Sequence, residues 1–387
     1  MRKLKTAMFG TGFMGKVHTE GIRRLGNVEV AAVAGSSLAT AEKFAAAMNI
    51  PKAADWRAVL ADPEIDAVHI CTPNVLHHSM AKAALEAGKN VLCEKPLTMN
   101  AAEARELAAQ ADAKKLAHCT NHNLRFYPVV QHIRSMVAAG ELGDILIVNG
   151  TYFQDWLLYE TDWNWRALSA SNGALRAMGD IGSHWIDLLQ HVTGDVVTSV
   201  HAQLERVHDT RIRPPEGGRE TFASGGGAGE PVAVDTEDMA LVLFRTASGI
   251  RGSVTISQVS AGWKNRLVLE VDAAEASFVW DQEEPNHLRI GRRDGANRDV
   301  LRDPSQLGPA AARLARYPAG HQEGWPDALR NLFDDFYRTI AGANDDVRTL
   351  ASFVEAARVQ AVVEAVLRSD ATGVWVEVDD VVKEVSA

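Results

Sequence analysis

The sequence has few cysteines and no long apolar run. Its three cysteines, Cys71, Cys93 and Cys119, form no CxxC pair, which argues against a disulfide framework and against a zinc knuckle. We expect them to be reduced and mostly buried in strands. No stretch approaches the ~20 apolar residues of a membrane span, so neither a transmembrane helix nor a membrane partner is expected.

Positive charge is also in deficit. Lys and Arg number 40 against 50 Asp and Glu, which gives a formal charge of −10. Nucleic-acid affinity comes mainly from Lys and Arg that neutralise phosphates, so this balance argues against a nucleic-acid partner. The opening MRKLKTAMFG passes directly from a basic start into an apolar run and a glycine loop, without room for a signal-peptide core. A cytoplasmic location is therefore expected.

The first third of the chain alternates short apolar runs with longer amphipathic stretches. This alternation is typical of βαβ units on a parallel sheet. Strands are predicted near Lys5–Phe9, Val28–Ala34, Ala67–Cys71, Asn90–Cys93 and Leu116–Thr120. Alanine-rich segments between them favour helices, over Ala41–Met48, His77–Ala87 and Ala101–Ala113.

Three glycines follow the first predicted strand. The sequence FGTGFMG places Gly10, Gly12 and Gly15 in GxGxxG spacing, before a helix expected to begin near Met14. Such glycines allow a tight turn and let backbone amides approach a pyrophosphate, which the helix N-terminus favours electrostatically. In this context the motif predicts a Rossmann dinucleotide-binding site. The remaining loop residues expected to touch the dinucleotide are Thr11, Phe13 and Met14.

The pattern changes after Pro128. A helix over about Val129–Ala139 leads to strands near Ile145–Phe153, Val197–Arg206, Met239–Phe244, Gly252–Gln258, Asn265–Val271 and Ala276–Trp280, and helices return over Trp325–Ile340 and Ala351–Leu367. Consecutive strands favour a mostly antiparallel sheet. The glycine-rich segment Pro214–Pro231 is expected to be a mobile loop. We therefore predict an α/β protein with a Rossmann domain over residues 1–124. A second α/β domain with a large, mostly antiparallel open sheet is predicted over residues 125–387.

No acidic residue follows the second predicted strand, where a carboxylate often binds the ribose 2′-hydroxyl of NAD. Ser36 and Ser37 stand there instead, and Lys43 lies a turn or two into the next helix. These residues could accept a 2′-phosphate, or the small polar side chains could bind NAD without the carboxylate. NAD is the predicted cofactor, and NADP stays possible.

Two further motifs carry groups suited to acid–base chemistry. Glu94 and Lys95 follow a predicted strand at the carboxyl edge of the sheet, where Lys95 could hydrogen-bond a substrate hydroxyl; the alternative is an exposed ion pair at a turn.

In the second motif, GDIGSHWIDLLQH, Asp180 and His184 are four residues apart, and His184 suits a general base at neutral pH. Asp180 could instead be an N-cap, and His184, Asp187 and His191 could form the polar face of a surface helix. Their spacing also allows a metal site, but no further cluster supports one.

Taken together, these motifs resemble the glucose-fructose oxidoreductase and inositol dehydrogenase (Gfo/Idh/MocA) family over nearly the whole chain. The matching pieces are the glycine loop, CTPN of Cys71–Asn74 followed by His77, EKP of Glu94–Pro96, Asn123, and DIGSH of Asp180–His184. The resemblance implies that Thr72, Pro73, Asn74 and His77 line the dinucleotide, that Glu94 and Lys95 lie by the nicotinamide ribose, and that Asn123 lies near the carboxamide. It also implies catalytic roles for Lys95, Asp180 and His184, and a homo-oligomer, dimer or tetramer, built through the open sheet.

A tryptophan-rich segment between Phe153 and Asp180 is predicted to bind the substrate. Aromatic faces pack on sugar rings, and an arginine can bind hydroxyls or an anion. The predicted substrate contacts are Trp156, Trp163, Arg166 and Arg125, together with Lys95, Asp180 and His184. By resemblance to sugar-oxidising members, Trp165 and Arg166 could instead touch the cofactor. The alternative is interdomain packing. Arg211, Arg213 and Arg219, on the predicted mobile loop, are expected to be solvated.

The sequence thus predicts reversible oxidation of a secondary hydroxyl of a sugar, glycoside or cyclitol by NAD(P). The alternative is a redox-neutral glycosidase, whose substrate could be an anionic glycoside. Such an enzyme oxidises the sugar transiently, commonly at C3, and then eliminates the aglycone, and it would use the same residues. A third hypothesis is a non-catalytic dinucleotide sensor. It should lack an intact base and lysine, which this chain keeps.

Overall fold

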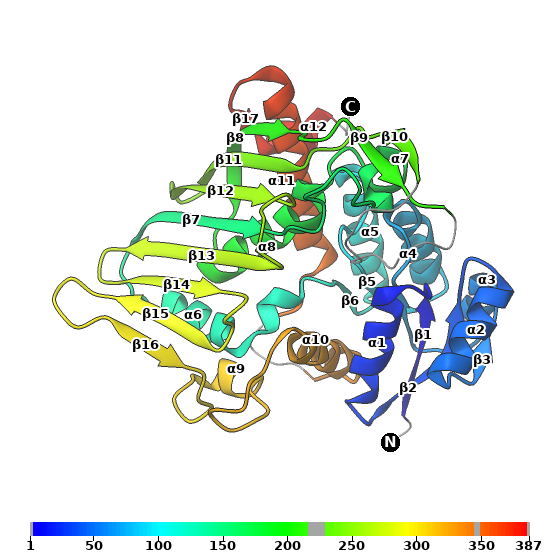
Figure 1. The fold of residues 1–387 in the computed structure, drawn as a ribbon. Helices are drawn as coiled ribbons and strands as arrows, with labels where there is room; N and C mark the ends of the chain where they lie inside the picture. Colours follow the sequence, from blue (N-terminus) through cyan, green and yellow to red (C-terminus); the bar gives the residue numbers. More distant parts are fainter. Residues whose placement is uncertain (1–2, 216–228, 344–348, 385–387) are drawn as a thin grey trace. The chain divides into compact units, whose positions relative to one another are not determined.

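The computed structural model describes residues 3–215, 229–343 and 349–384. Its internal contacts divide the chain into two compact units. Unit 1 comprises Met1–Phe126 and Gly324–Arg358, and unit 2 comprises Tyr127–Glu323 and Val359–Ala387 (Figure 1).

Unit 1 is built on a parallel sheet of six strands in the order β3-β2-β1-β4-β5-β6. The strands are β1 (Leu4–Phe9), β2 (Val28–Ala34), β3 (Lys52–Ala53), β4 (Ala67–Ile70), β5 (Asn90–Cys93) and β6 (His118–Thr120). The order reverses between β1 and β4, and ligands of such sheets bind outside the carboxyl ends of the strands at that point. The predicted parallel Rossmann sheet is confirmed. The two-residue strand β3 escaped prediction.

Helices connect these strands. They are α1 (Phe13–Arg23), α2 (Leu38–Met48), α3 (Trp56–Leu60), α4 (His77–Glu86) and α5 (Ala101–Lys114). The alanine-rich faces of α4 and α5 pack on the buried strands, as Ala81, Ala84 and Ala104 do in the core. Small side chains let a helix lie close to the sheet, which explains why these segments contain so much alanine.

A segment from late in the chain also belongs to unit 1. Helix α10 (Trp325–Ile340) packs against α1, where a Cβ on Gly21 would lie 2.7 Å from the ring of Phe333. The start of α11 (Phe353–Thr372) adds Phe353 to the same core. The predicted boundary at residues 124 and 125 placed Gly324–Arg358 in the second domain, whereas its contacts join it to unit 1. Sequence order could not reveal this return.

Unit 2 contains a sheet of nine strands in the order β16-β15-β14-β13-β7-β12-β11-β8-β17. They are β7 (Ile145–Phe153), β8 (Val197–Glu205), β11 (Met239–Thr246), β12 (Arg251–Ser257), β13 (Arg266–Ala273), β14 (Ser277–Asp281), β15 (His287–Gly291), β16 (Arg298–Leu301) and β17 (Val376–Glu377). Among the described strands of this sheet only β7 and β12 pair in parallel, so the predicted mostly antiparallel sheet is confirmed. The sequence did not predict β15, β16 and β17.

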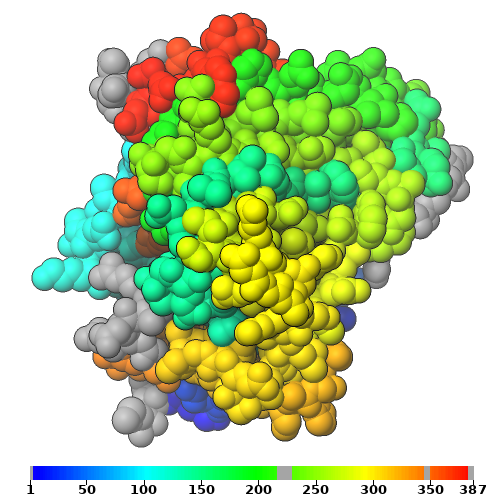
Figure 2. Space-filling model, turned by 90° about the vertical axis from the view of Figure 1, so that its left-hand side faces the viewer, coloured from blue at the N-terminus to red at the C-terminus, as the bar shows by residue number. Residues whose placement is uncertain are grey.

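One face of this sheet is covered by helices. Helix α8 (Ser183–Thr193) lies behind the strands together with α6 (Pro128–Ala138) (Figure 1). The fully buried Trp185 on α8 donates its indole N–H to the Val268 carbonyl of β13 at 2.9 Å, and a Cβ on Gly150 would collide with that indole. Side chains along β11 alternate between the helix-covered face and the other face of the sheet, where Leu241 and Leu243 are exposed. Figure 2, turned by 90°, looks at the ends of the strands, and the segment of β15 and β16 (yellow) lies at the surface of that side.

Two smaller strands, β9 (Thr210–Arg213) and β10 (Glu230–Ala233), pair antiparallel beside the predicted glycine-rich segment. Residues 216–228 of that segment, including Arg219, lie outside the described residues. The C-terminal helix α12 (Val378–Glu384) was not predicted. Within the described part of the chain, no helix is long and apolar enough to cross a membrane.

Candidate active site

The glycine loop after β1 has a separate reason for each glycine. Gly10 has φ +116°, and a Cβ on it would lie 2.4 Å from the Cys71 carbonyl oxygen after β4. A Cβ on Gly15 would lie 2.2 Å from the Gly10 oxygen, so this glycine permits close packing of α1 on the loop. Gly12, the N-cap of α1, meets no protein atom within 4 Å of a built Cβ. The space beside Gly12 fits a ligand group approaching the helix N-terminus, as a pyrophosphate does.

The tip of β2 is polar and uncharged. Ser37 caps α2 by accepting a hydrogen bond from the Thr40 amide at 3.2 Å, while the Thr40 hydroxyl accepts from the Ser37 amide at 3.0 Å. Ser36 and Lys43 are exposed. Both serines are exposed, and Ser37 is engaged in the capping box, whereas Ser36 lies beside it.

The loop after β4 holds the CTPN motif. Asn74 and His77 are buried, whereas Thr72 is half-buried and Pro73 is exposed. The ring of His77 bridges two backbone carbonyls, those of Thr72 at 2.9 Å and Pro96 at 2.7 Å. Burial lowers the pKa of His77, although both carbonyls oppose the shift. His77 therefore ties the loop after β4 to the loop after β5, a role in shaping the site that its family match did not indicate.

Glu94 and Lys95 stand at the end of β5. Glu94 is buried, and its Oε1 accepts hydrogen bonds from His18 Nε2 at 2.9 Å and from Asn121 Nδ2 at 2.5 Å. Its Oε2 accepts a long bond of 3.3 Å from the Lys95 amide. Burial alone would raise the pKa of Glu94, but these donors and the Lys95 charge hold it below its usual value. Because Glu94 is buried, the alternative of an exposed ion pair at a turn is wrong for Glu94, whereas Lys95 is half-exposed.

Asn123 begins a short 3₁₀ turn (Asn123–Phe126) after β6. Its buried Nδ2 has no hydrogen-bond partner among the described residues, and the same holds for the Thr72 hydroxyl after β4. Buried donors normally find acceptors, so both atoms fit a site completed by a polar ligand. Arg125, a predicted substrate contact, is buried and its NH1 donates to Glu355 Oε1 at 2.7 Å. The charge of Arg125 is therefore paired with a carboxylate of unit 1.

In unit 2 the DIGSH motif forms a π-helical turn followed directly by α8. The turn, Met178–Gly182, contains Asp180, and His184 is in the first turn of α8. π-helical turns often occur at functional sites. Asp180 is buried, whereas His184 is partly exposed between buried neighbours. The N-cap of α8 is Gly182, so the alternative of Asp180 as an N-cap is wrong.

The surface-helix interpretation of this motif is also wrong. Asp187 and His191 are buried, and His191 Nε2 lies 2.7 Å from Gln131 Nε2 and 3.2 Å from Arg134 NH1. His191 therefore ties α8 to α6. Among the described residues, no group of His, Cys, Asp and Glu side chains could hold a metal ion.

Asp180 is the centre of a polar cluster. Its Oδ2 accepts from Gln258 Nε2 at 3.1 Å, and its Oδ1 lies 3.5 Å from Arg166 Nε. Arg166 also lies over the ring of Trp165, with Cζ 4.5 Å from the ring centre. Asn164 caps the short 3₁₀ turn Trp165–Ala167 by accepting from the Arg166 amide at 3.0 Å, which fixes the backbone from which Arg166 reaches Asp180.

Trp156, Arg166, Asp180 and Gln258 line one small cavity of about 10 Å³, together with Leu157, Asn164 and Arg176. A volume of 10–15 Å³ holds about one water, so this cavity by itself is too small for a sugar ring. Trp163 lies apart from it, with its ring centre 5.9 Å from Arg213 Cζ. The structure thus brings three of the predicted residues, Trp156, Arg166 and Asp180, together within unit 2.

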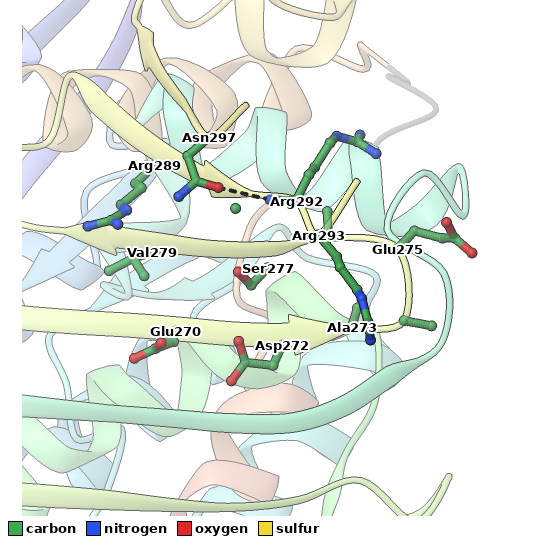
Figure 3. A pocket seen from close by; sticks show the side chains of 13 residues that line it. Glu270, Asp272, Ala273, Glu275, Ser277, Val279, Arg289, Arg292, Arg293 and Asn297 are labelled. Atoms are coloured by element: carbon green, nitrogen blue, oxygen red, sulfur yellow. Dashed lines mark hydrogen bonds between the residues drawn. The ribbon is translucent and has the colours of Figure 1, made fainter. Parts of the chain in front are cut away.

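A roomier cavity of about 590 Å³ lies elsewhere on unit 2, along β13, β14 and β15 (Figure 3). Glu270 and Asp272 line it together with Arg289, Arg292 and Arg293. None of the predicted site residues lines it. Its lining of acidic and basic side chains does not combine a base and a proton donor around a substrate position. The larger volume of this cavity therefore does not make it the candidate active site.

Sequence reasoning missed a buried acidic pair behind the Asp180 cluster. Asp238 is fully buried and pairs with Arg176 and Arg211, the latter at 2.6 Å. Glu237 accepts hydrogen bonds from the backbone amides of Arg176 at 2.8 Å and Met178 at 2.7 Å, where the π-helical turn begins. Burial raises the pKa of Glu237 to about 7 despite these donors.

Arg211 connects this pair to the tryptophan-rich segment. Its guanidinium donates to the carbonyls of Leu157, Tyr159 and Asp162 at 2.8 to 3.1 Å. The expectation that Arg211 is solvated on a mobile loop is wrong, because it is fully buried in β9. The adjacent acids Glu237 and Asp238, just before a strand, were the sequence signal for a buried polar cluster.

Comparison with known proteins identifies both parts of the chain. Residues 4–122 match the oxidoreductase family described as an NAD-binding Rossmann fold, and residues 130–279 match the GFO/IDH/MocA C-terminal domain. The predicted NAD-binding domain is thereby confirmed. The levoglucosan dehydrogenase of Pseudarthrobacter phenanthrenivorans is 30% identical over 98% of this chain and 100% of its own. The trans-1,2-dihydrobenzene-1,2-diol dehydrogenase of Bos taurus is 29% identical over 68% of this chain and 70% of its own.

Solved structures agree. A levoglucosan dehydrogenase in complex with NADH and L-sorbose has a TM-score of 0.87, with 27% identity over 98% of this chain and 99% of its own. Its fold therefore extends over both units.

Proposed function

Because the chain belongs to the Gfo/Idh/MocA family of oxidoreductases, we propose that it oxidises a secondary hydroxyl of a sugar, glycoside or cyclitol with NAD. The observation that carries this proposal is the polar cluster of unit 2. A buried carboxylate, Asp180, meets Gln258 and Arg166 beside tryptophan rings, and a partly exposed histidine, His184, follows on the same helix. Vicinal hydroxyls are bound by such acceptors and donors, and sugar rings stack on aromatic faces. The levoglucosan dehydrogenase relative, and the levoglucosan dehydrogenase solved in complex with NADH and L-sorbose, support a carbohydrate as the substrate class.

In the proposed reaction, bound NAD supplies the acceptor for the hydride that leaves the carbinol carbon. His184 accepts the hydroxyl proton at a ring nitrogen as the C–O bond becomes a carbonyl. The Lys95 ammonium donates a hydrogen bond to the same oxygen and stabilises the negative charge that develops as the proton departs. Asp180 orients His184 or holds a neighbouring hydroxyl. Trp165 and Arg166 contact the substrate or the cofactor.

Substitution of the base and of the lysine tests this assignment. His184→Ala and Lys95→Ala should each lower turnover by about 10²-fold, since a positioned acid–base group usually contributes that much. His287→Ala and Lys82→Ala are matched controls, because both side chains are partly exposed on other elements, and should keep full activity. Retention of more than about a tenth of turnover in either site variant would contradict the mechanism.

The substrate itself is identified by a panel. Neutral, acidic and sulfonated sugars and their glycosides are offered with NAD and with NADP, while reduced cofactor and free aglycone are followed together. Accumulation of NADH with a polyol supports the proposal. Release of aglycone without net NADH would identify a redox-neutral glycosidase, and cofactor binding without turnover on any substrate would identify a sensor. Use of NADP, a homo-oligomer and a cytoplasmic location stay predictions.

A further inference from the structure

Unit 1 buries a line of hydrogen-bonded side chains that the proposed reaction does not use. His18 on α1 and His69 on β4 are fully buried, and their Nδ1 atoms lie 2.9 Å apart. His69 Nε2 lies 2.8 Å from the hydroxyl of Tyr337 on α10. At the other end, His18 Nε2 lies 2.9 Å from Glu94 Oε1. The line therefore runs from the late segment of the chain, through the core of the sheet, to the carboxylate at the end of β5.

The direction of these hydrogen bonds can be worked out. Glu94 is ionised, because its pKa is held below the usual value despite burial, and a carboxylate only accepts. The Nε2 of His18 must therefore carry a hydrogen and donate it to Glu94. Burial, with the nearby His18, holds the pKa of His69 well below its usual range, so that ring is neutral and has one N–H.

The remaining contacts then fit one order without burying a further charge. Burial raises the pKa of Tyr337, so the phenol keeps its proton and donates to His69 Nε2. The hydrogen of His69 is on Nδ1 and is donated to His18 Nδ1. Each buried donor thus meets an acceptor, and three aromatic contacts with Phe333 and Phe336 hold the rings in place. His18 cannot rotate without losing bonds at both nitrogens.

The two oxygens of Glu94 are used unequally. Oε1 accepts from His18 and Asn121, while Oε2 accepts one long bond, of 3.3 Å, from the Lys95 amide. A carboxylate held at one oxygen presents the other in a fixed direction. We propose that His18, itself held by His69 and Tyr337, is a positioning residue that fixes Glu94 for a hydrogen bond to the nicotinamide ribose of NAD. This inference rests on the proposed function, through the role of Glu94.

Binding of two ligands to the intact chain tests the inference. NADH contains the nicotinamide ribose, whereas ADP carries only the adenosine half, so a fault at Glu94 affects the first ligand alone. In His18→Leu the donor to Oε1 is lost, and affinity for NADH should fall about tenfold or more, as expected for loss of a hydrogen bond to a charged group. Affinity for ADP should stay within about twofold of the wild type. General misfolding would weaken both ligands.

Further variants separate positioning from packing. His18→Gln keeps an N–H donor near the position of Nε2 and should restore most of the NADH affinity. Tyr337→Phe removes the hydroxyl that contacts His69 and Thr6, and should weaken NADH binding by about threefold at unchanged ADP affinity. Phe333→Leu disturbs the ring packing on His18 and His69 without touching a hydrogen bond. It should lower stability and leave the ratio of NADH to ADP affinity unchanged.

Glu94→Ala distinguishes failure of this inference from failure of the proposed function. Unchanged NADH affinity in Glu94→Ala would overturn the role of Glu94, and the inference with it. A loss in Glu94→Ala without a selective loss in His18→Leu or Tyr337→Phe would overturn the inference alone. If Glu94 binds the ribose and His18 positions Glu94, the double variant His18→Leu/Glu94→Ala should bind NADH no more weakly than Glu94→Ala, because the two residues act through one contact.

Discussion

Gly12 separates the requirements of the fold from those of the cofactor. Its backbone has φ −82° and ψ −166°, an extended conformation open to any residue, and a built Cβ meets no protein atom within 4 Å. Gly12→Ala should therefore leave the free energy of unfolding of the apo chain within about 0.5 kcal/mol, or raise it slightly by restricting the unfolded chain. Only the ligand is affected, because the added methyl group occupies the space through which a pyrophosphate approaches the backbone.

The expected loss of affinity follows from the size of that methyl group. Inserting a methyl into a filled space typically costs about 1–3 kcal/mol, which corresponds to roughly 5- to 150-fold in the dissociation constant for NADH. Gly15→Ala is the matched control. A Cβ there would lie 2.2 Å from the Gly10 carbonyl, a backbone atom that cannot move aside easily. This variant should lose stability without any ligand present.

Thermal unfolding with and without NADH measures both effects. At 100 times the dissociation constant, ligand binding stabilises the wild type by about 2.7 kcal/mol. If Gly12→Ala binds about 100-fold more weakly, the same concentration stabilises it by only about 0.4 kcal/mol. A loss of more than about 1 kcal/mol in apo Gly12→Ala would mean that the fold requires this glycine. Unchanged NADH affinity would mean that the ligand does not approach here.

Two more predictions concern the acidic pair of unit 2. Asp238→Asn should lower the free energy of unfolding at neutral pH by about 3–5 kcal/mol in chemical denaturation, because two buried guanidinium groups lose their counter-charge; a loss below about 1 kcal/mol would refute the buried ion pair. Glu237 has a pKa of about 7 in the folded chain against 4.5 for the unfolded one, so the folded state binds the proton more tightly. Its contribution to stability should therefore decline between about pH 4.5 and 7, by a few kcal/mol in total. Stability of wild type relative to Glu237→Gln, measured across that range, should fall as pH rises, and a flat difference would exclude the shifted pKa.

Strand and helix positions in unit 1 could be predicted because local pattern and tertiary structure agree there. Buried parallel strands are short apolar runs, and the glycine loop follows the first of them in the order that the fold requires. The helix Trp325–Ile340 was also predicted with its observed bounds, yet its membership in unit 1 was not. Nothing in an amphipathic pattern says which sheet a helix covers, since burial of its apolar face stabilises it against either.

The site shows the same division between chemistry and its support. Lys95, Asp180 and His184 were chosen from motifs, because their side chains act on a ligand and their types suit proton transfer. The residues that hold the sites in shape come from distant parts of the chain, as Tyr337 and Glu237 do, and carry no motif. Their shared feature is a polar atom placed where the fold removes water. A buried polar atom is costly unless paired, so the partners of Glu94 and Asp180 are determined by tertiary contacts that no local pattern records. Substitutions in these supporting residues should therefore change cofactor or substrate affinity without touching either ligand.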